Sequence, residues 1–225
     1  LSGSNRLFNT LGAVYYETGN YSQARNYFEK AIAVLPPGES AYADLLANYK
    51  VNLASTLNKL ELYEEAQAIY AALLPLNRNR TEILHNLGAI RSAQREYREA
   101  IAYFRQVSYS NNKMIRLCND MASAWLQLHQ PDSARYWINR AMEENKKWNG
   151  DQKNTPHGLT LRYAGDAFAA AGDPQQALRF YQQALMQFDR EFNDSSLTAN
   201  PQSFEVVFSY IQLFQTLIAK AVANS

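Results

Sequence analysis

Residues 10–36 (TLGAVYYETGNYSQARNYFEKAIAVLP) carry apolar and small side chains at the spacing of two amphipathic helices. Gly19, with Asn20 and Tyr21, interrupts the pattern, and glycine tolerates the backbone angles of a tight turn. Pro36-Pro37-Gly38 then ends the second helix. The pattern predicts a helical hairpin with one uncovered apolar face, which needs a neighbouring element to cover it.

The small residue of the second helix recurs along the chain, and its spacing measures the repeat. It stands at Ala24, Ala66, Ala100, Ala134 and Ala177, in steps of 42, 34, 34 and 43 residues. We expect the first long step to lengthen a helix over 40–60, because that run contains no breaker. We expect the second to lie in a long polar loop over 145–158.

The repeats predict an all-α superhelical array of about five helix-turn-helix units followed by a last helix. Thr81 is expected to cap a helix N-terminus, Pro131 to open another, and Asp173 to cap a third, with Gln176 completing a capping box. The expected units cover 5–38, 39–78, 81–112, 115–147 and 158–191, and the last helix covers 201–223, all in one array.

The packing positions resemble those of tetratricopeptide repeats over nearly the whole chain. The first unit shows them at Leu11-Gly12, Tyr15, Ala24, Phe28, Ala31 and Pro36. Similar sets recur around Leu87-Gly88 and Ala164-Gly165, and the two longer steps resemble the variant repeats of kinesin light chains. The resemblance implies a non-catalytic scaffold for protein–protein interaction, with no cofactor.

A narrower resemblance lies near the end of the chain. The run ALRFYQQALMQFDREFND, a short turn at Asn200-Pro201 and an apolar helix ending in LIAKA resemble the repeat region that precedes a CHAT (caspase-like) domain, often in bacteria. This resemblance implies a repeat region that regulates a C-terminal protease-like domain, against which the last helix would dock. The alternative is a sensor or assembly module of an unrelated bacterial protein.

Composition narrows the classes of partner. The chain has 22 basic and 21 acidic residues, a formal charge of +1, which argues against nucleic-acid binding through bulk charge. No apolar run is long enough to span a membrane. The sequence leaves the compartment undetermined, with the cytoplasm as the preferred expectation for a soluble chain.

Nothing in the sequence favours catalysis or metal binding. Cys118 takes an inward helical position, where a buried thiol is the ordinary interpretation, although a cysteine hydrolase using Cys118 is a remote alternative. His85, His129 and His157 are scattered without metal-ligand spacing, and His157 is expected in a solvated loop. Trp148 is expected to fold back onto nearby helices.

The register predicts a concave groove that binds a peptide or protein partner. Asn side chains there could hydrogen-bond a peptide backbone, and Arg116 and Arg162 could bind a carboxylate. Asn9 and Ala13 do not match the Lys and Asn pair of a chaperone carboxylate clamp. Replacing Asn119 and Arg162 by Ala should weaken binding without changing the melting temperature. The predicted groove residues are Asn9, Tyr16, Ser55, Asn58, Lys59, His85, Ser92, Arg116, Asn119, Ser123, Gln127, Arg162 and Asp166.

Overall fold

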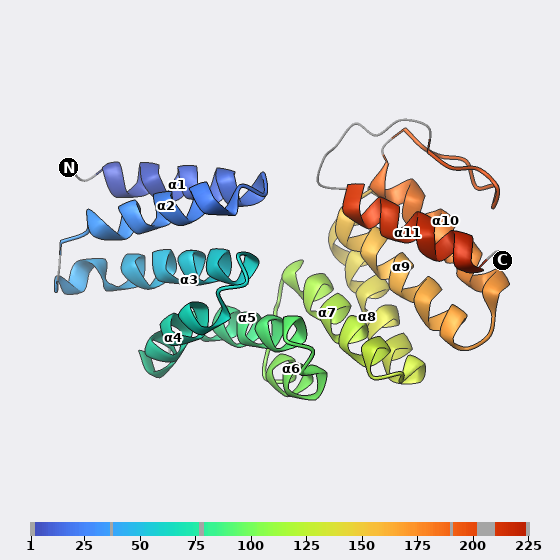
Figure 1. The fold of residues 1–225 in the computed structure, drawn as a ribbon, viewed down its shortest axis with the longest axis horizontal. Helices are drawn as coiled ribbons and strands as arrows, with labels where there is room; N and C mark the ends of the chain where they lie inside the picture. Colours follow the sequence, from blue (N-terminus) through green and yellow to red (C-terminus); the bar gives the residue numbers. More distant parts are fainter. Residues whose placement is uncertain (1–2, 37, 77–78, 190, 202–209, 224–225) are drawn as a thin grey trace. The chain divides into compact units, whose positions relative to one another are not determined.

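A computed structural model describes residues 3–36, 38–76, 79–189, 191–201 and 210–223, with side chains from 215 onward in the last of these ranges (Figure 1). Within these ranges every regular element is a helix, which confirms the all-α prediction. None of these helices is both long and apolar enough to cross a membrane. The chain divides into two compact units, residues 1–95 and 96–225, and each is described by itself.

The first unit is built from five α-helices and two short 3₁₀ turns. Its helices are α1 (Ser4–Glu17), α2 (Tyr21–Ala33), α3 (Ala43–Lys59), α4 (Tyr63–Leu73) and α5 (Arg80–Ala93), with 3₁₀ turns at Ser40–Tyr42 and Leu74–Leu76. Each helix packs against the next one along the chain, and α3 also contacts α1 and α5 (Figure 1). Tyr70 and Ile83 are fully buried in its core.

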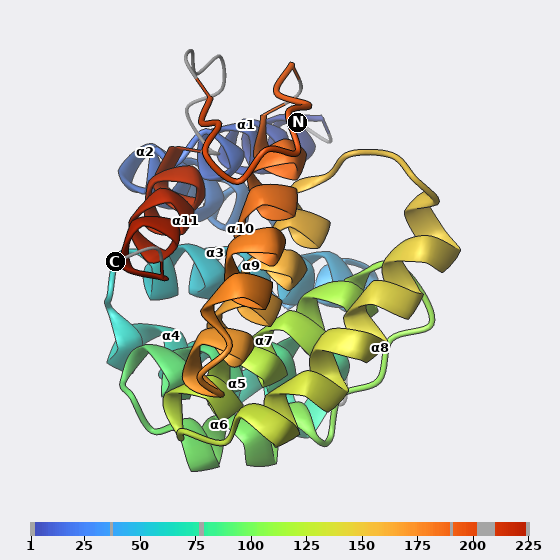
Figure 2. The same ribbon diagram turned by 90° about the vertical axis from the view of Figure 1, so that its right-hand side faces the viewer.

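The second unit contains six helices in its described part. They are α6 (Tyr97–Phe104), α7 (Lys113–Gln127), α8 (Pro131–Asn149), α9 (Thr155–Ala170), α10 (Pro174–Phe188) and α11 (Tyr210–Ala223). The central helix α9 contacts α7, α8, α10 and α11 (Figure 2). Residues 202–209 of the predicted last helix lie outside the described residues.

The turns inside the hairpins repeat with the same period as the alanines. Each contains one residue in the left-handed region, at φ 78°, 61°, 64°, 56° and 78° for Gly19, Glu61, Arg95, His129 and Gly172. Their steps, 42, 34, 34 and 43 residues, equal those of the alanine series. The five alanines themselves are fully buried. One backbone geometry therefore closes all five hairpins, although only two of them use glycine.

Close approach of the two helices explains the glycines at the crossings. A Cβ added at Gly12 would lie 2.7 Å from the Phe28 ring, and one at Gly165 would lie 2.3 Å from the Tyr181 ring. Real Cβ contacts are never this short, so both positions need glycine for the aromatic ring to fill the crossing.

The predicted long loop over 145–158 is wrong, because most of that segment is helical. α8 continues to Asn149 and α9 begins at Thr155, which leaves only residues 150–154 between them. Buried Asn145 holds the junction: its Oδ1 accepts hydrogen bonds from Nδ2 of Asn149 at 2.9 Å and of Asn154 at 3.0 Å. Asn154 in turn caps α9, accepting a hydrogen bond from the His157 backbone N–H at 2.8 Å.

Of the remaining local predictions, three are confirmed and one is wrong. The first long step does lengthen a helix, α3 with its preceding 3₁₀ turn. Asp173 caps α10 by accepting from the Gln176 N–H at 3.0 Å, and Pro131 opens α8, as predicted. Thr81 is not a cap, because α5 already begins at Arg80, after Asn79 at φ 52°. The exact bounds of the repeats, and their union in one array, stay predictions.

Candidate functional site

A row of polar side chains crosses the first helices of successive hairpins in the first unit. Asn52 Nδ2 on α3 donates to Asn9 Oδ1 on α1 at 3.0 Å, and Asn86 Nδ2 on α5 donates to Ser55 Oγ on α3 at 3.1 Å. Ser55 Oγ also lies 3.0 Å from the Tyr70 hydroxyl. These four residues, Asn9, Asn52, Ser55 and Asn86, are called the polar row, and each is half-buried.

Only two members of the polar row, Asn9 and Ser55, are among the groove residues predicted from the sequence. Asn52 and Asn86 were missed, although they stand 34 residues apart, one repeat period, and that spacing was the available signal. The hydrogen bonds of the polar row use only part of the hydrogen-bonding capacity of each side-chain amide. The Asn9 NH₂ group still donates no hydrogen bond within the described residues.

The other predicted groove residues of the first unit differ in exposure. Tyr16 packs edge-on against the Tyr21 ring at 5.5 Å, and Asn58 and Ser92 are half-buried. Lys59 is exposed. His85 is only 3% exposed, so the prediction that it faces a partner is wrong.

Asn119 in the second unit ties α7 to α9 instead of facing solvent. Its Nδ2 donates to the Pro156 carbonyl at 2.9 Å, and its Oδ1 accepts from the Thr160 hydroxyl at 2.8 Å. Asn119 is 3% exposed and Thr160 fully buried. Asn119→Ala would remove both of these hydrogen bonds between α7 and α9, so we now expect it to lower the melting temperature.

Arg162 and Asp166 lie one turn apart on α9, and both are engaged within the unit. The Tyr181 hydroxyl donates to Asp166 Oδ1 at 2.9 Å. Burial raises the pKa of the Asp166 carboxyl, while Arg162 and the Tyr181 hydroxyl oppose that rise. Arg162 Nη1 donates to Gln215 Oε1 on α11 at 3.2 Å, and its guanidinium lies 4.7 Å from the Tyr163 ring centroid. Arg162 is thus less free to bind a carboxylate than the register suggested.

The remaining predicted residues of the second unit are more accessible. Arg116 is exposed and lies 3.7 Å from Asp120 in an ion pair within α7. Ser123 is half-buried, and exposed Gln127 accepts a hydrogen bond from the Tyr97 hydroxyl at 3.4 Å. These three side chains remain the better candidates for partner contact in this unit.

The side chains considered for catalysis are not placed for it. Cys118 is fully buried, and burial raises the pKa of its thiol to about 12, so the reactive thiolate is disfavoured. His157 stands in the first turn of α9, half-buried, and not in a solvated loop as predicted; burial lowers its pKa. No cluster of three or more potential metal ligands occurs among the described residues.

Trp148 lies on the last turn of α8, not in a loop. Its indole N–H donates to Glu144 Oε2 at 2.9 Å, and the Lys147 ammonium lies 5.0 Å from its ring centroid. The side chain remains 42% exposed, so it follows its own helix and leaves part of the ring open to solvent.

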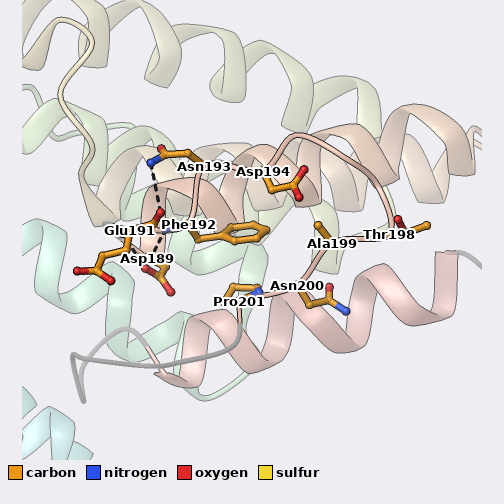
Figure 3. A pocket seen from close by; sticks show the side chains of 9 residues that line it. All are labelled: Asp189, Glu191, Phe192, Asn193, Asp194, Thr198, Ala199, Asn200 and Pro201. Carbon is orange, nitrogen blue, oxygen red and sulfur yellow. Dashed lines mark hydrogen bonds between the residues drawn. The ribbon is translucent and has the colours of Figure 1, made fainter.

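A polar pocket of about 670 Å³ lies in the segment between α10 and α11 (Figure 3). Asp189 Oδ1 accepts from the backbone N–H groups of Glu191 and Phe192, which turns the chain there. Lys153 Nζ donates to the Asp189 and Phe192 carbonyls, and Lys220 Nζ donates to the Ala199 carbonyl and to Gln182 Oε1. Burial lowers the pKa of both lysines. These hydrogen bonds fold the chain around the pocket, so we interpret the pocket as part of the connection between α10 and α11.

Comparison with known proteins supports the repeat assignment in two places. Residues 6–37 and 83–112 each match a family described as tetratricopeptide repeat. An uncharacterized protein, ycf37 of Pyropia yezoensis, is 33% identical over 76 residues, which cover 32% of this chain. The match spans about a third of that relative, 36% of its length.

Solved structures resemble the chain in fold. One, from the functional characterization of Pseudomonas aeruginosa pilF, has a TM-score of 0.61 at 17% identity, over 99% of this chain and 89% of that one. BtubC (BKLC) from P. vanneervenii gives 0.63 at 17%, over 89% and 84%. Putative kinesin light chain repeats from Podosopora anserina give 0.58 at 15%, over 81% and 93%.

At these identities the structural likeness establishes the helical fold alone. Proteins built from such repeats bind protein partners and are generally non-catalytic scaffolds. Residues 6–37 and 83–112 thus match tetratricopeptide repeats, and such repeats suggest a scaffold for protein–protein interaction.

Proposed function

We propose that the face of α1, α3 and α5 that carries the polar row binds an extended segment of a protein partner. The polar row itself supports the proposal, because its bonds place half-buried amides and a hydroxyl side by side on α1, α3 and α5. Asparagine amides offer both donors and acceptors, the groups that an extended peptide backbone needs. We include Asn58 and Lys59, which also lie on α3, in the proposed binding face.

The NH₂ group of Asn9 and the amide of Asn58 are the contacts on which the proposal depends most. Neither group has a hydrogen-bond partner within the described residues, and both side chains are half-exposed. Each hydrogen bond gained on binding contributes about 1 kcal/mol. Losing two of them, about 2 kcal/mol, should weaken binding by about thirtyfold.

The test is selection of peptides from a random display library on the whole 225-residue chain, followed by fluorescence polarization with the peptides recovered. Asn9→Ala combined with Asn58→Ala should raise the dissociation constant about thirtyfold. The matched control is Asn26→Ala on α2, an exposed asparagine off the proposed face, which should leave it unchanged.

Melting curves accompany both variants, so that a loss of fold is separated from a loss of binding. Equal affinity of the double variant and the wild type, with both folded, would remove the α1–α3–α5 face from consideration. Arg116, Ser123 and Gln127 on α7 would then become the next face to test in the second unit.

We further propose that the chain regulates a protease-like domain. The resemblance of residues 177–223 to repeat regions that precede CHAT domains supports a scaffold that governs a protease-like domain. Ile218 and Val222 support it further, since they are 65% and 69% exposed on α11, at the i and i+4 spacing of a docking stripe. Sequencing the complete gene tests this role: a caspase-like region with its His and Cys after Ser225 is expected. A membrane span with a kinase pattern there would favour the sensor alternative.

A further inference from the structure

An apolar notch in the second unit is left unexplained by the proposed function. It is a cavity of about 120 Å³ lined by three helices, α8, α9 and α10. Ile138 and Ala164 are buried at its wall, and Met142 is half-buried beside them. Phe168 and Phe180 stack on each other with ring centroids 5.3 Å apart. The exposed side chains of Arg135 and Asn139 complete the lining, so they form its rim.

Within the second unit, the notch faces away from the predicted groove residues Arg162 and Asp166. Along α9, successive residues turn by about 100°, so Ala164 and Phe168 point about 160° away from Arg162 and Asp166. On α8 the lining residues 135, 138, 139 and 142 form one stripe at helical spacing. A partner in the notch would therefore approach the second helices of the hairpins, a different surface from the one proposed above.

The rim carries a positive charge without a partner. The Arg135 guanidinium lies 5.1 Å from the Phe168 ring centroid and forms no ion pair with any described residue. The side chain of Asn139, one turn further along α8, likewise makes no hydrogen bond in the described part of the chain. A guanidinium held against an aromatic ring keeps its N–H edges available for a carboxylate.

The size of the cavity limits what can enter. At about 30 Å³ for each water molecule of the liquid, it holds the volume of about four waters, far less than a drug-sized ligand needs. That volume suits one branched aliphatic side chain. Its apolar walls favour such a group over a polar one.

We propose that the notch is a second docking site, which takes a partner segment where a branched aliphatic side chain stands next to an aspartate or glutamate. The aliphatic group fills the space between Met142, Ala164 and Phe168, and the carboxylate accepts hydrogen bonds from Arg135. The charge of Arg135 and the apolar cavity beside it select this occupant together. The site does not depend on the polar row, so either proposal can fail alone.

The experiment is a methyl NMR titration of the whole chain, observing Ile138 and Met142. The probe is the blocked peptide acetyl-Ser-Leu-Asp-Ser-amide. Its controls are the same peptide with Asn for Asp, which removes the charge, and with Ala for Leu, which removes the aliphatic group. We expect the first peptide to shift both methyl signals saturably, and each control to bind at least about fivefold more weakly.

A charge reversal at the rim gives the second test. Arg135→Glu should weaken binding of the Leu-Asp peptide at least about tenfold, because it replaces attraction by repulsion. The matched control is Arg98→Glu, which makes the same charge change at an exposed position on α6, outside the notch, and should leave binding unchanged. Both positions are exposed, so both variants should fold.

Three results would each overturn the proposal. The Asn peptide could bind as well as the Asp peptide, which would leave an apolar site without acidic selectivity. Arg135→Glu and Arg98→Glu could bind the probe equally. The methyl signals could instead shift with protein concentration alone, which would identify a second copy of this chain as the occupant.

Discussion

His129 holds its backbone at φ 56° in the turn between α7 and α8, where a Cβ costs free energy. Gly172 adopts φ 78° at the equivalent turn between α9 and α10, with nothing within 4 Å of an added Cβ. The two turns differ in strain, not in available space. Glu61 and Arg95 carry the same strain in the two remaining turns without glycine.

The variant His129→Gly should therefore be more stable than the wild type. Relief of the left-handed strain, about 1–2 kcal/mol, exceeds the entropy cost of glycine, about 0.5–1 kcal/mol. We expect a gain of about 0.5–1 kcal/mol in the free energy of unfolding by urea titration. The opposite change, Gly172→Ala, should lower it, and stabilisation by both changes would contradict a shared turn geometry.

Asp166 gives the protein a pH-dependent weakness. Because burial raises its pKa above the ordinary 3.8, the folded state binds the proton more tightly than the unfolded state. Its contribution to stability is present below the ordinary pKa and is lost as pH rises through the folded-state pKa. Asp166→Asn keeps an acceptor for the Tyr181 hydroxyl without the charge.

Melting temperatures of Asp166→Asn and the wild type at pH 4 and pH 7 test this argument. The difference, variant minus wild type, should be larger at pH 7, because the wild-type carboxyl is more ionised there than at pH 4. Asp151→Asn is the control, because Asp151 is exposed in the segment between α8 and α9. A difference that stays constant would show that Arg162 compensates the effect of burial fully, and a difference that shrinks toward pH 7 would show that the folded-state pKa is lowered.

Residue type and spacing predict which residues pack at helix crossings better than they predict which side chains are exposed to solvent. Glycine at 12 and 165 and alanine at 24 and 177 follow from the closeness of two helices, which any repeat of this kind requires. His85 and Asn119 sit at positions where the register expects solvent, and both are buried. The partner of Asn119, the Pro156 carbonyl, becomes known only once the start of α9 is known.

At the level of elements, α7 and α9 are joined by the buried Asn119–Thr160 pair. Asn119→Ala should destabilise the protein by about 1–3 kcal/mol, since it leaves the Thr160 hydroxyl and the Pro156 carbonyl with fewer partners. Thr160→Val should cost less, because Asn119 keeps its bond to Pro156. Urea titration of both single variants and the double variant gives the coupling energy.

We expect a coupling of about 0.5–3 kcal/mol, the range of contacting side chains. Additive effects of the two substitutions would instead mean that the pair does not act as a unit. Ser123→Ala, on the same helix and half-buried, is the control and should change stability by less than about 0.5 kcal/mol.

Helix caps follow from sequence where side chain and backbone agree, as at Asp173 with Pro174. They fail where the backbone alone turns the chain, as at Asn79, whose side chain caps nothing. The second long step was misplaced for a related reason. Polar residues such as Asn145 and Asn149 suggested a loop, but their amides bond to each other along the helix and to the start of the next one.

For the whole molecule, the balanced charge sets an expectation for polyanions. With a formal charge of +1, the chain should elute from heparin at or below about 0.15 M salt, because retention requires clustered basic side chains. Arg135→Glu should elute no later than the wild type. Elution at several-fold higher salt would reveal a basic surface that the composition conceals.

The helical class and the repeat period are readable from the whole sequence, because they depend on local spacing summed over five hairpins. The division into two compact units after Arg95 cannot be read from the sequence. It falls inside one hairpin, between α5 and α6, where the alanine and turn series continue without a change of step. A periodic sequence pattern does not indicate where along the chain the contacts between residues become fewer.

The extension of α8 has a consequence for how this chain can vary in length. Nineteen residues carry its end about 9 Å further than the 13 residues of α2 would. A residue gained or lost there would rotate the following turn by about 100° and carry Asn149 and Trp148 off their present faces. Residues 150–152 are exposed and have no helical phase to keep, whereas Lys153 and Asn154 are held by hydrogen bonds. We therefore expect insertions and deletions to be tolerated better at residues 150–152 than within α8.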